Sequence, residues 1–155
     1  KNKIRVLIAD DNVEFAMTLN ENLSKDEEMD VIGIAKDGNE AYKMIKEQQP
    51  DVVLLDVIMP HLDGLGVLET LNSNPVEKMP LCIMLSAVGQ DKITQKAINL
   101  GAEYYIVKPF DINILMKRIK DEFGITSIAG KNLSEYSFYT LIGFVTRMRN
   151  GEEIK

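Results

Sequence analysis

The chain has 155 residues, a length typical of one domain with room for a short appendage. Hydrophobic residues make up 45% and charged residues 27% of the sequence, an ordinary mixture for a globular protein. The formal net charge of −6 argues against a broad electrostatic surface for DNA or RNA, and favours metal binding or a regulatory contact.

Three further features bear on the compartment. The single cysteine, Cys82, excludes an internal disulfide framework, and its apolar neighbours favour burial. No apolar stretch approaches the ~18–20 residues of a transmembrane helix, so we expect no membrane association. Residues 1–3 lead directly into a strand-like run and not into a signal peptide, so we expect a cytoplasmic location.

Short apolar runs alternate with amphipathic segments along most of the chain. Strands buried on both faces are almost continuously apolar, and these runs therefore predict strands. The predicted strands are Ile4–Ala9, Asp30–Ala35, Val52–Leu55, Leu81–Leu85 and Tyr104–Val107.

Apolar residues spaced three or four positions apart follow each predicted strand, as in a helix with one buried face. The first helix is predicted from about Val13 to Ser24, where Phe15, Leu19 and Leu23 recur at spacing four. Phe15 either packs in the core or faces a partner. The other predicted helices contain Ala41 and Ile45; Leu65, Leu68 and Leu71; Ile93, Ala97 and Ile98; and Ile112, Leu115 and Ile119.

Five strands that are each followed by a helix predict an α/β fold with a parallel sheet. Right-handed crossovers favour a flavodoxin-like, doubly wound, five-stranded sheet of order 2-1-3-4-5. The first and third strands are neighbours in this order. It therefore predicts that Asp10, Asp11 and Asp56 lie side by side.

Residues 125–155 do not continue the alternation, and we interpret them as a linker or C-terminal extension after a domain at 1–124. Asn132 followed by Glu135 is a capping signal, and the apolar spacing beyond it predicts a helix at about 133–149. The run Ser137–Ile142 also has high strand propensity, so a strand there remains an alternative.

Polar residues at four strand ends are the candidate site. Asp10 and Asp11 follow the first strand, Asp56 the third, Ser86 the fourth and Lys108 the fifth. In an open parallel sheet such groups gather at one edge. Three close carboxylates repel one another, and without a cation at least one of their pKa values should rise.

A bound Mg²⁺ would relieve this repulsion, because it is a hard cation that prefers oxygen ligands. A backbone carbonyl near Ile58 could complete the ligands. Asp56 could then attack an activated phosphoryl donor and form an acyl phosphate. Lys108 and the Ser86 hydroxyl could stabilise charge on the transferred group. Each residue alone is ordinary at a helix cap or turn, but their joint occurrence favours a phosphorylation pocket.

These residues resemble the response-regulator receiver domain of two-component and phosphorelay signalling, with its CheY-like fold. The similarity covers about Ile4 to Phe123. Its motifs are Asp10-Asp11-Asn12, Leu54 to Pro60, Asp63-Gly64, Leu85-Ser86-Ala87, Gly101-Ala102 and Lys108-Pro109-Phe110.

The resemblance implies roles for the pocket residues. Asp56 would be the phosphoacceptor, Asp11 a direct Mg²⁺ ligand and Asp10 a ligand acting largely through water. Ile58 would give its backbone carbonyl to the metal, and Lys108 would pair with the phosphoryl group. Mn²⁺ or Ca²⁺ could take the place of Mg²⁺.

The resemblance also implies a switch. Ser86 and Tyr105 match the switch pair: Ser86 would move toward the phosphoryl group, and Tyr105 would turn inward. The face of the fourth helix, fifth strand and fifth helix would then change and favour a partner, such as a second copy in a phosphorylation-linked homodimer. The donor would be a histidine kinase or phosphotransfer protein. The domain would not be an enzyme, since it would promote only its own phosphorylation and dephosphorylation.

A closer similarity concerns the runs Ile58–Leu65, Val88–Asp91 and Tyr105–Asp111. They look like receivers of the sporulation master regulators of endospore-forming Firmicutes, particularly clostridial forms. Such regulators join a receiver to a DNA-binding domain. The similarity implies control of sporulation transcription, with DNA contacted only through an effector domain in a longer parent protein. The segment after Gly124 resembles neither the linker nor the effector of that type.

Two other functions remain open. A metal-dependent phosphatase or phosphotransferase of the haloacid-dehalogenase type also uses an Asp nucleophile, but it usually has a second Asp where this chain has Ile58. A phosphorylation-independent interaction domain is the other alternative, and the complete acidic pocket argues against it.

Overall fold

The computed structural model describes residues 3–87 and 91–124 of the chain. The predicted extension at 125–155, with its helix at about 133–149, lies outside the described residues, and so does Val88.

The described chain alternates strictly between strand and helix, as the sequence predicts. The strands are β1 (Ile4–Ala9), β2 (Met29–Ala35), β3 (Val52–Asp56), β4 (Leu81–Ser86) and β5 (Tyr104–Val107). The helices are α1 (Val13–Ser24), α2 (Gly38–Gln48), α3 (Gly64–Ser73), α4 (Asp91–Asn99) and α5 (Ile112–Glu122). Within the part that the structure describes, no helix is both long and apolar enough to cross a membrane.

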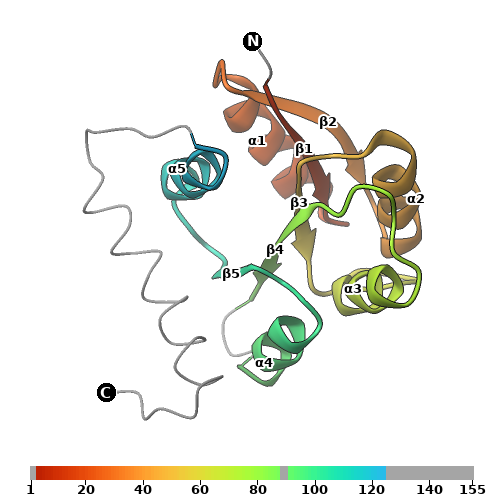
Figure 1. The fold of residues 1–155 in the computed structure, drawn as a ribbon. Coiled ribbons are helices and arrows are strands. Elements are labelled where there is room, and N and C mark those ends of the chain that lie inside the picture. The colour runs from red at the N-terminus through yellow and green to blue at the C-terminus, as the bar shows by residue number, and fades with distance from the viewer. Residues whose placement is uncertain (1–2, 88–90, 125–155) are drawn as a thin grey trace.

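The strands form one sheet in the order β2-β1-β3-β4-β5, and every neighbouring pair is parallel. Helices α1 and α5 cover one face of the sheet, and α2, α3 and α4 cover the other (Figure 1). This arrangement confirms the predicted doubly wound, CheY-like fold and its strand order.

Two strands extend one residue beyond their apolar runs. Asp56 is the last residue of β3, where it pairs with Leu85, and Ser86 is the last residue of β4, where it pairs with Val107. The prediction ended both strands too early because backbone pairing continues after the side chains become polar. Both groups are therefore held by the sheet ladder itself.

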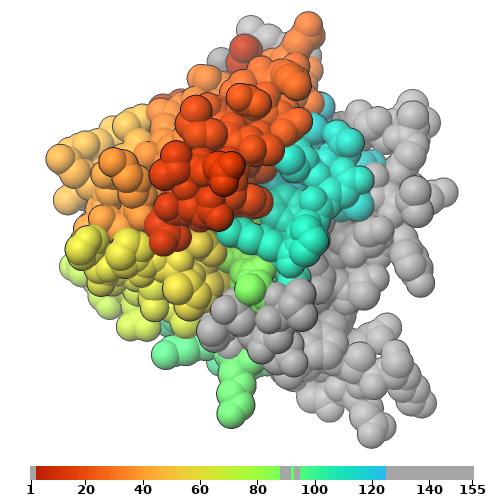
Figure 2. Space-filling model, turned by 180° about the vertical axis from the view of Figure 1, so that it is seen from behind, coloured from red at the N-terminus to blue at the C-terminus, as the bar shows by residue number. Residues whose placement is uncertain are grey.

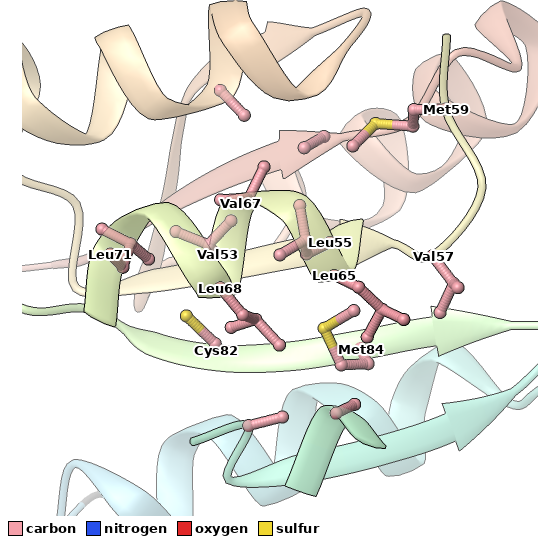
Figure 3. Packing of buried hydrophobic residues seen from close by; sticks show 14 of the residues in the cluster. Val53, Leu55, Val57, Met59, Leu65, Val67, Leu68, Leu71, Cys82 and Met84 are labelled. Carbon is pink, nitrogen blue, oxygen red and sulfur yellow. The ribbon is translucent and has the colours of Figure 1, made fainter. Parts of the chain in front are cut away.

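The core has one part on each face of the sheet. In β3, Val52 and Leu54 join the cluster under α1 and α5, and Val53 and Leu55 join the cluster under α2, α3 and α4. Figure 3 shows the cluster under α2, α3 and α4, in which side chains of β3, β4 and α3 pack together. Each fully buried aliphatic side chain contributes about 1.5–3 kcal/mol to stability. The strand that ends at Asp56 is thus packed on both faces, which gives Asp56 a rigid base.

The loop between β3 and α3 returns close to the end of β3. The amide of Gly64 donates to the carbonyl of Val57 at 2.8 Å, and a Cβ at Gly64 would lie only 2.3 Å from the carbonyl oxygen of Asp56. The Asp63 side chain caps α3 by accepting from the Gly66 amide at 2.7 Å. Only glycine fits this approach, which fixes the segment directly after Asp56.

Candidate functional site

Three carboxylates meet at the carboxyl edge of the sheet. Strands β1 and β3 pair in a register that ends at Ala9 and Leu55, so the residues that follow, Asp10 and Asp56, are neighbours. One carboxylate oxygen from each of Asp10, Asp11 and Asp56 lies within 4.8 Å of the others. The predicted convergence is therefore present. Figure 2 shows a face on which the segment after β1 (red), the segment after β3 (yellow) and the segment around the start of α5 (turquoise) adjoin.

The three carboxylates differ in burial. Asp10 is buried, Asp56 is partly buried and Asp11 is exposed. Both oxygens of Asp10 are engaged: Oδ1 accepts from the Asn12 amide and Oδ2 accepts from Lys108 Nζ, each at 2.8 Å. Asp10 is thus a fixed anchor, whereas Asp56 and Asp11 are at least partly accessible to solvent.

Lys108 brings the positive charge. Its amide donates to the carbonyl of Ser86 at 2.7 Å, which ties the end of β5 to the end of β4. Its Nζ lies 2.8 Å from Oδ2 of Asp10 and 3.7 Å from Oδ1 of Asp56. The peptide bond between Lys108 and Pro109 is cis. The ammonium therefore bridges the anchored carboxylate and the one at the end of β3.

The electrostatics of the pocket are unbalanced toward negative charge. The pKa of Asp56 is raised to about 7: burial is the largest cause, and the charge and hydrogen bonding of Asp10 and the charge of Asp11 act in the same direction. The ammonium of Lys108 opposes this rise and does not cancel it. The outcome is the one expected for three close carboxylates that share one lysine.

This donor set fits a divalent cation. Its carboxylate oxygens are close together, carry excess negative charge and are reachable from solvent through Asp11 and Asp56. Ile58 is 57% exposed, and its carbonyl accepts no hydrogen bond from the residues that the structure describes. A carbonyl at this position suits a hard cation, which takes oxygen ligands of both kinds.

The two predicted switch residues are buried here. Ser86 is 1% exposed, and its hydroxyl donates to the carbonyl of Ala87 at 3.2 Å and not to Asp56. Tyr105 is 3% exposed and packs with the cluster under α2, α3 and α4. The inward position of Tyr105 is therefore already occupied in this structure.

An aromatic pair beside Lys108 was not predicted. The ammonium lies 4.1 Å from the centroid of the Phe15 ring, and the Phe15 and Phe110 rings meet edge to face, with centroids 6.1 Å apart and planes at 79°. The spacing of Phe15 with Leu19 and Leu23 indicates only that it lies on the buried side of a helix. The one signal that could have found the contact is that Phe15 and Lys108 both follow strand ends of the same edge.

Comparison with known proteins assigns the family. Residues 6–120 match the response regulator receiver domain model, and the chain belongs to this family. Its members are signalling phosphoacceptor domains that bind Mg²⁺ at an acidic pocket.

Solved structures of receiver domains agree with this assignment. The signal receiver domain of NarL from Mycobacterium tuberculosis is 30% identical, with a TM-score of 0.72; the match covers 78% of this chain and 96% of that one. The response regulator domain of Thermotoga maritima CheB is 30% identical, with a TM-score of 0.69 and coverage of 81% and 100%. A chain of the CheX-CheY-BeF3-Mg complex from Borrelia burgdorferi is 31% identical, with a TM-score of 0.70 and coverage of 79% and 90%.

Proposed function

We propose that the chain accepts a phosphoryl group on Asp56 from a phosphohistidine of a histidine kinase or phosphotransfer protein. One observation carries this proposal: Asp56 lies at the end of β3 within 4.8 Å of two further carboxylates and 3.7 Å from an ammonium. A carboxylate beside a cation site and a positive side chain is the arrangement that acyl phosphate formation needs.

The transfer is a displacement at phosphorus. A carboxylate oxygen of Asp56 forms the new O–P bond while the N–P bond of the donor breaks, and the imidazole leaves with the electron pair. Lys108, held by Asp10 at 2.8 Å, pairs with the oxygens of the transferred group. Mg²⁺, or Mn²⁺ or Ca²⁺ in its place, would be held by Asp11, by Asp10 through water, by Asp56 and by the Ile58 carbonyl, and it supplies the remaining positive charge.

The phosphorylated domain then acts as a switch. The Ser86 hydroxyl exchanges its bond to the Ala87 carbonyl for one to the phosphoryl group, and Tyr105 is retained in its buried position. The face formed by α4, β5 and α5 changes as a result and controls an output, with homodimerisation as one route. The domain promotes its own phosphorylation and dephosphorylation and acts on no other substrate.

The wider setting of the proposal comes from the sequence motifs. We place the receiver at residues 1–124, the linker or extension at 125–155, and the protein in the cytoplasm. The proposed output is transcription of sporulation genes through an effector domain in a longer parent protein. Binding of the parent protein to promoter DNA before and after phosphorylation, compared in a sporulating host, tests this output.

Phosphorylation is tested with the purified chain, Mg²⁺ and a small phosphodonor. Intact mass should rise by one phosphoryl group, and the rise should be absent in Asp56→Asn and after chelation of the metal. Asp30→Asn, which changes an exposed aspartate on β2, is the matched control and should label normally. Continuous turnover of an external phosphate ester without stoichiometric labelling would contradict the switch and favour a phosphatase or phosphotransferase.

A further inference from the structure

We infer that Phe15 is a positioning residue for Lys108: its ring holds the ammonium at the phosphorylation pocket. The inference rests on the proposed function for its consequence and on the geometry of this structure for its position. The ammonium has three described contacts, with Asp10, Asp56 and the Phe15 ring, at 2.8, 3.7 and 4.1 Å.

The three contacts of Lys108 are of two chemical kinds. Asp10 and Asp56 are carboxylates, and both belong to the group that suits a divalent cation. A cation bound there would compete with the ammonium for the same oxygens. The face of an aromatic ring attracts an ammonium through its quadrupole and offers nothing to a hard cation that seeks oxygen. The contact with Phe15 therefore persists when the carboxylates take another partner.

The ring is itself well fixed. Asn12 caps α1 and accepts from the Phe15 amide at 3.1 Å, while the Asn12 amide donates to Asp10 at 2.8 Å. Phe110, in the segment between β5 and α5, meets the Phe15 ring edge to face. Asn12 therefore orients the backbone of Phe15 and is also hydrogen-bonded to Asp10, the carboxylate that anchors Lys108. Ring, carboxylate and ammonium form one connected unit across the α1 and β5 sides of the pocket.

The expected effect is on the transfer step and not on metal binding. Lys108 must reach the oxygens of the phosphoryl group, so a lysine that samples more rotamers is correctly placed less often. For a partly exposed cation–π contact, Phe15→Leu should slow phosphorylation by a small donor about three- to tenfold. The affinity for Mg²⁺ should stay as in the wild type, because Phe15 supplies no ligand.

The experiment compares Phe15→Leu, Phe15→Tyr and Met17→Leu in the full chain. Leucine keeps the apolar contact and removes the π face, tyrosine restores the π face, and Met17 is a 48% exposed control on the same helix. Three quantities are measured: the rate of phosphorylation from a small donor, the affinity for Mg²⁺ by calorimetry, and the lysine ε-proton resonances by NMR. Lys108→Gln identifies the Lys108 signals.

The inference predicts ε-proton signals of Lys108 that are displaced upfield by the ring, lost in Phe15→Leu and retained in Phe15→Tyr and Met17→Leu. The phosphorylation rate should follow the same order at unchanged Mg²⁺ affinity. The inference would be overturned if Phe15→Leu kept the wild-type ε-proton signals of Lys108 and the wild-type rate of phosphorylation. Equal slowing in the leucine and tyrosine variants would also overturn it, since the role would then be packing. If the wild type takes no phosphoryl group on Asp56, the proposed function fails instead, and the NMR comparison still decides the position of Lys108.

Discussion

The ionised form of Asp56 is disfavoured in the metal-free fold. Its carboxyl is partly buried beside two other acids, and these causes raise its pKa to about 7. At neutral pH the folded protein therefore carries an unfavourable interaction that the unfolded chain lacks. A cation or a partner that offsets the charge should stabilise the fold, which links the state of the pocket to the stability of the domain.

The Asp56→Asn variant should be more stable than the wild type without metal at about pH 8, by roughly 1–2 kcal/mol. The sign follows from the raised pKa: the folded state binds more protons than the unfolded state between about pH 4 and pH 7, so wild-type stability falls as pH rises through this range. Urea unfolding of both proteins, with Asp30→Asn as control, measures the difference. Equal stabilities at about pH 8 would contradict the account.

Mg²⁺ binding should weaken as the medium becomes acidic. Because protonated Asp56 cannot serve as a ligand, affinity should drop about tenfold between about pH 8 and pH 6 for a pKa of about 7. Isothermal titration calorimetry across this range measures the effect. Asp56→Asn should bind more weakly and show a flatter dependence, and a wild-type affinity that is constant over the range would refute the linkage.

At the scale of elements, each functional residue is placed by the element that carries it. Asp56 and Ser86 end two central strands, Asn12 caps α1, and Gly64 opens α3 directly beneath the end of β3. Changes in these connections should alter the pocket without touching its polar groups.

Gly64→Ala should destabilise the domain by about 1–3 kcal/mol, because the new methyl group would overlap the carbonyl oxygen of Asp56. The backbone shift needed to relieve this contact would also displace Asp56, so Mg²⁺ affinity should fall. Thermal unfolding and calorimetry measure both effects. Gly101→Ala is the control. Gly101 has a positive φ but no close neighbour, so its substitution by alanine strains the backbone without a contact with Asp56. A loss of Mg²⁺ affinity in Gly101→Ala alone would count against the proposed contact.

An ion pair joins α5 to the turn before β2. Burial alone would raise the pKa of Asp26, but the hydrogen bond and charge of Lys120 and the bond from the Glu28 amide together lower it. The pair therefore stabilises the fold above the unfolded pKa of Asp26, and this contribution is lost as pH falls through the lowered value. Lys120→Met should cost about 0.5–1 kcal/mol near pH 7 and less near pH 3. Chemical unfolding at both pH values measures this, with Lys43→Met on α2 as control, and a cost that grows on acidification would refute it.

The elements were predictable because most strands are apolar runs and each helix has an apolar stripe. The carboxylate cluster was predictable too, since strand order alone brings the ends of β1 and β3 together. The contact of Phe15 with Lys108 was not, because it depends on how α1 packs beside the segment after β5. The buried position of Tyr105 was not either, because a side-chain rotamer leaves no trace in sequence spacing.

At the scale of the whole molecule, the two core clusters pack the helices of the described residues onto both faces of the sheet. Both faces of the sheet are covered by helices from within residues 4–122 (Figure 1). Truncation after Gly124 should therefore leave the cooperative unfolding transition and the Mg²⁺ affinity unchanged. Calorimetry on the full and shortened chains tests this boundary, and a broad or missing transition in the shortened chain would show that the boundary lies further along.

The sheet and its core hold Asp56 at the end of β3, and we propose that this position presents Asp56 to a phosphodonor and a cation. The most direct test of this account is to phosphorylate the chain in the presence of Mg²⁺, reduce the acyl phosphate with borohydride, and map the modified peptide by mass spectrometry. The account predicts that aspartate is converted to homoserine at position 56 and at no other position. Modification of Asp10 or Asp11 in place of Asp56, or no reducible phosphate at all, would contradict it.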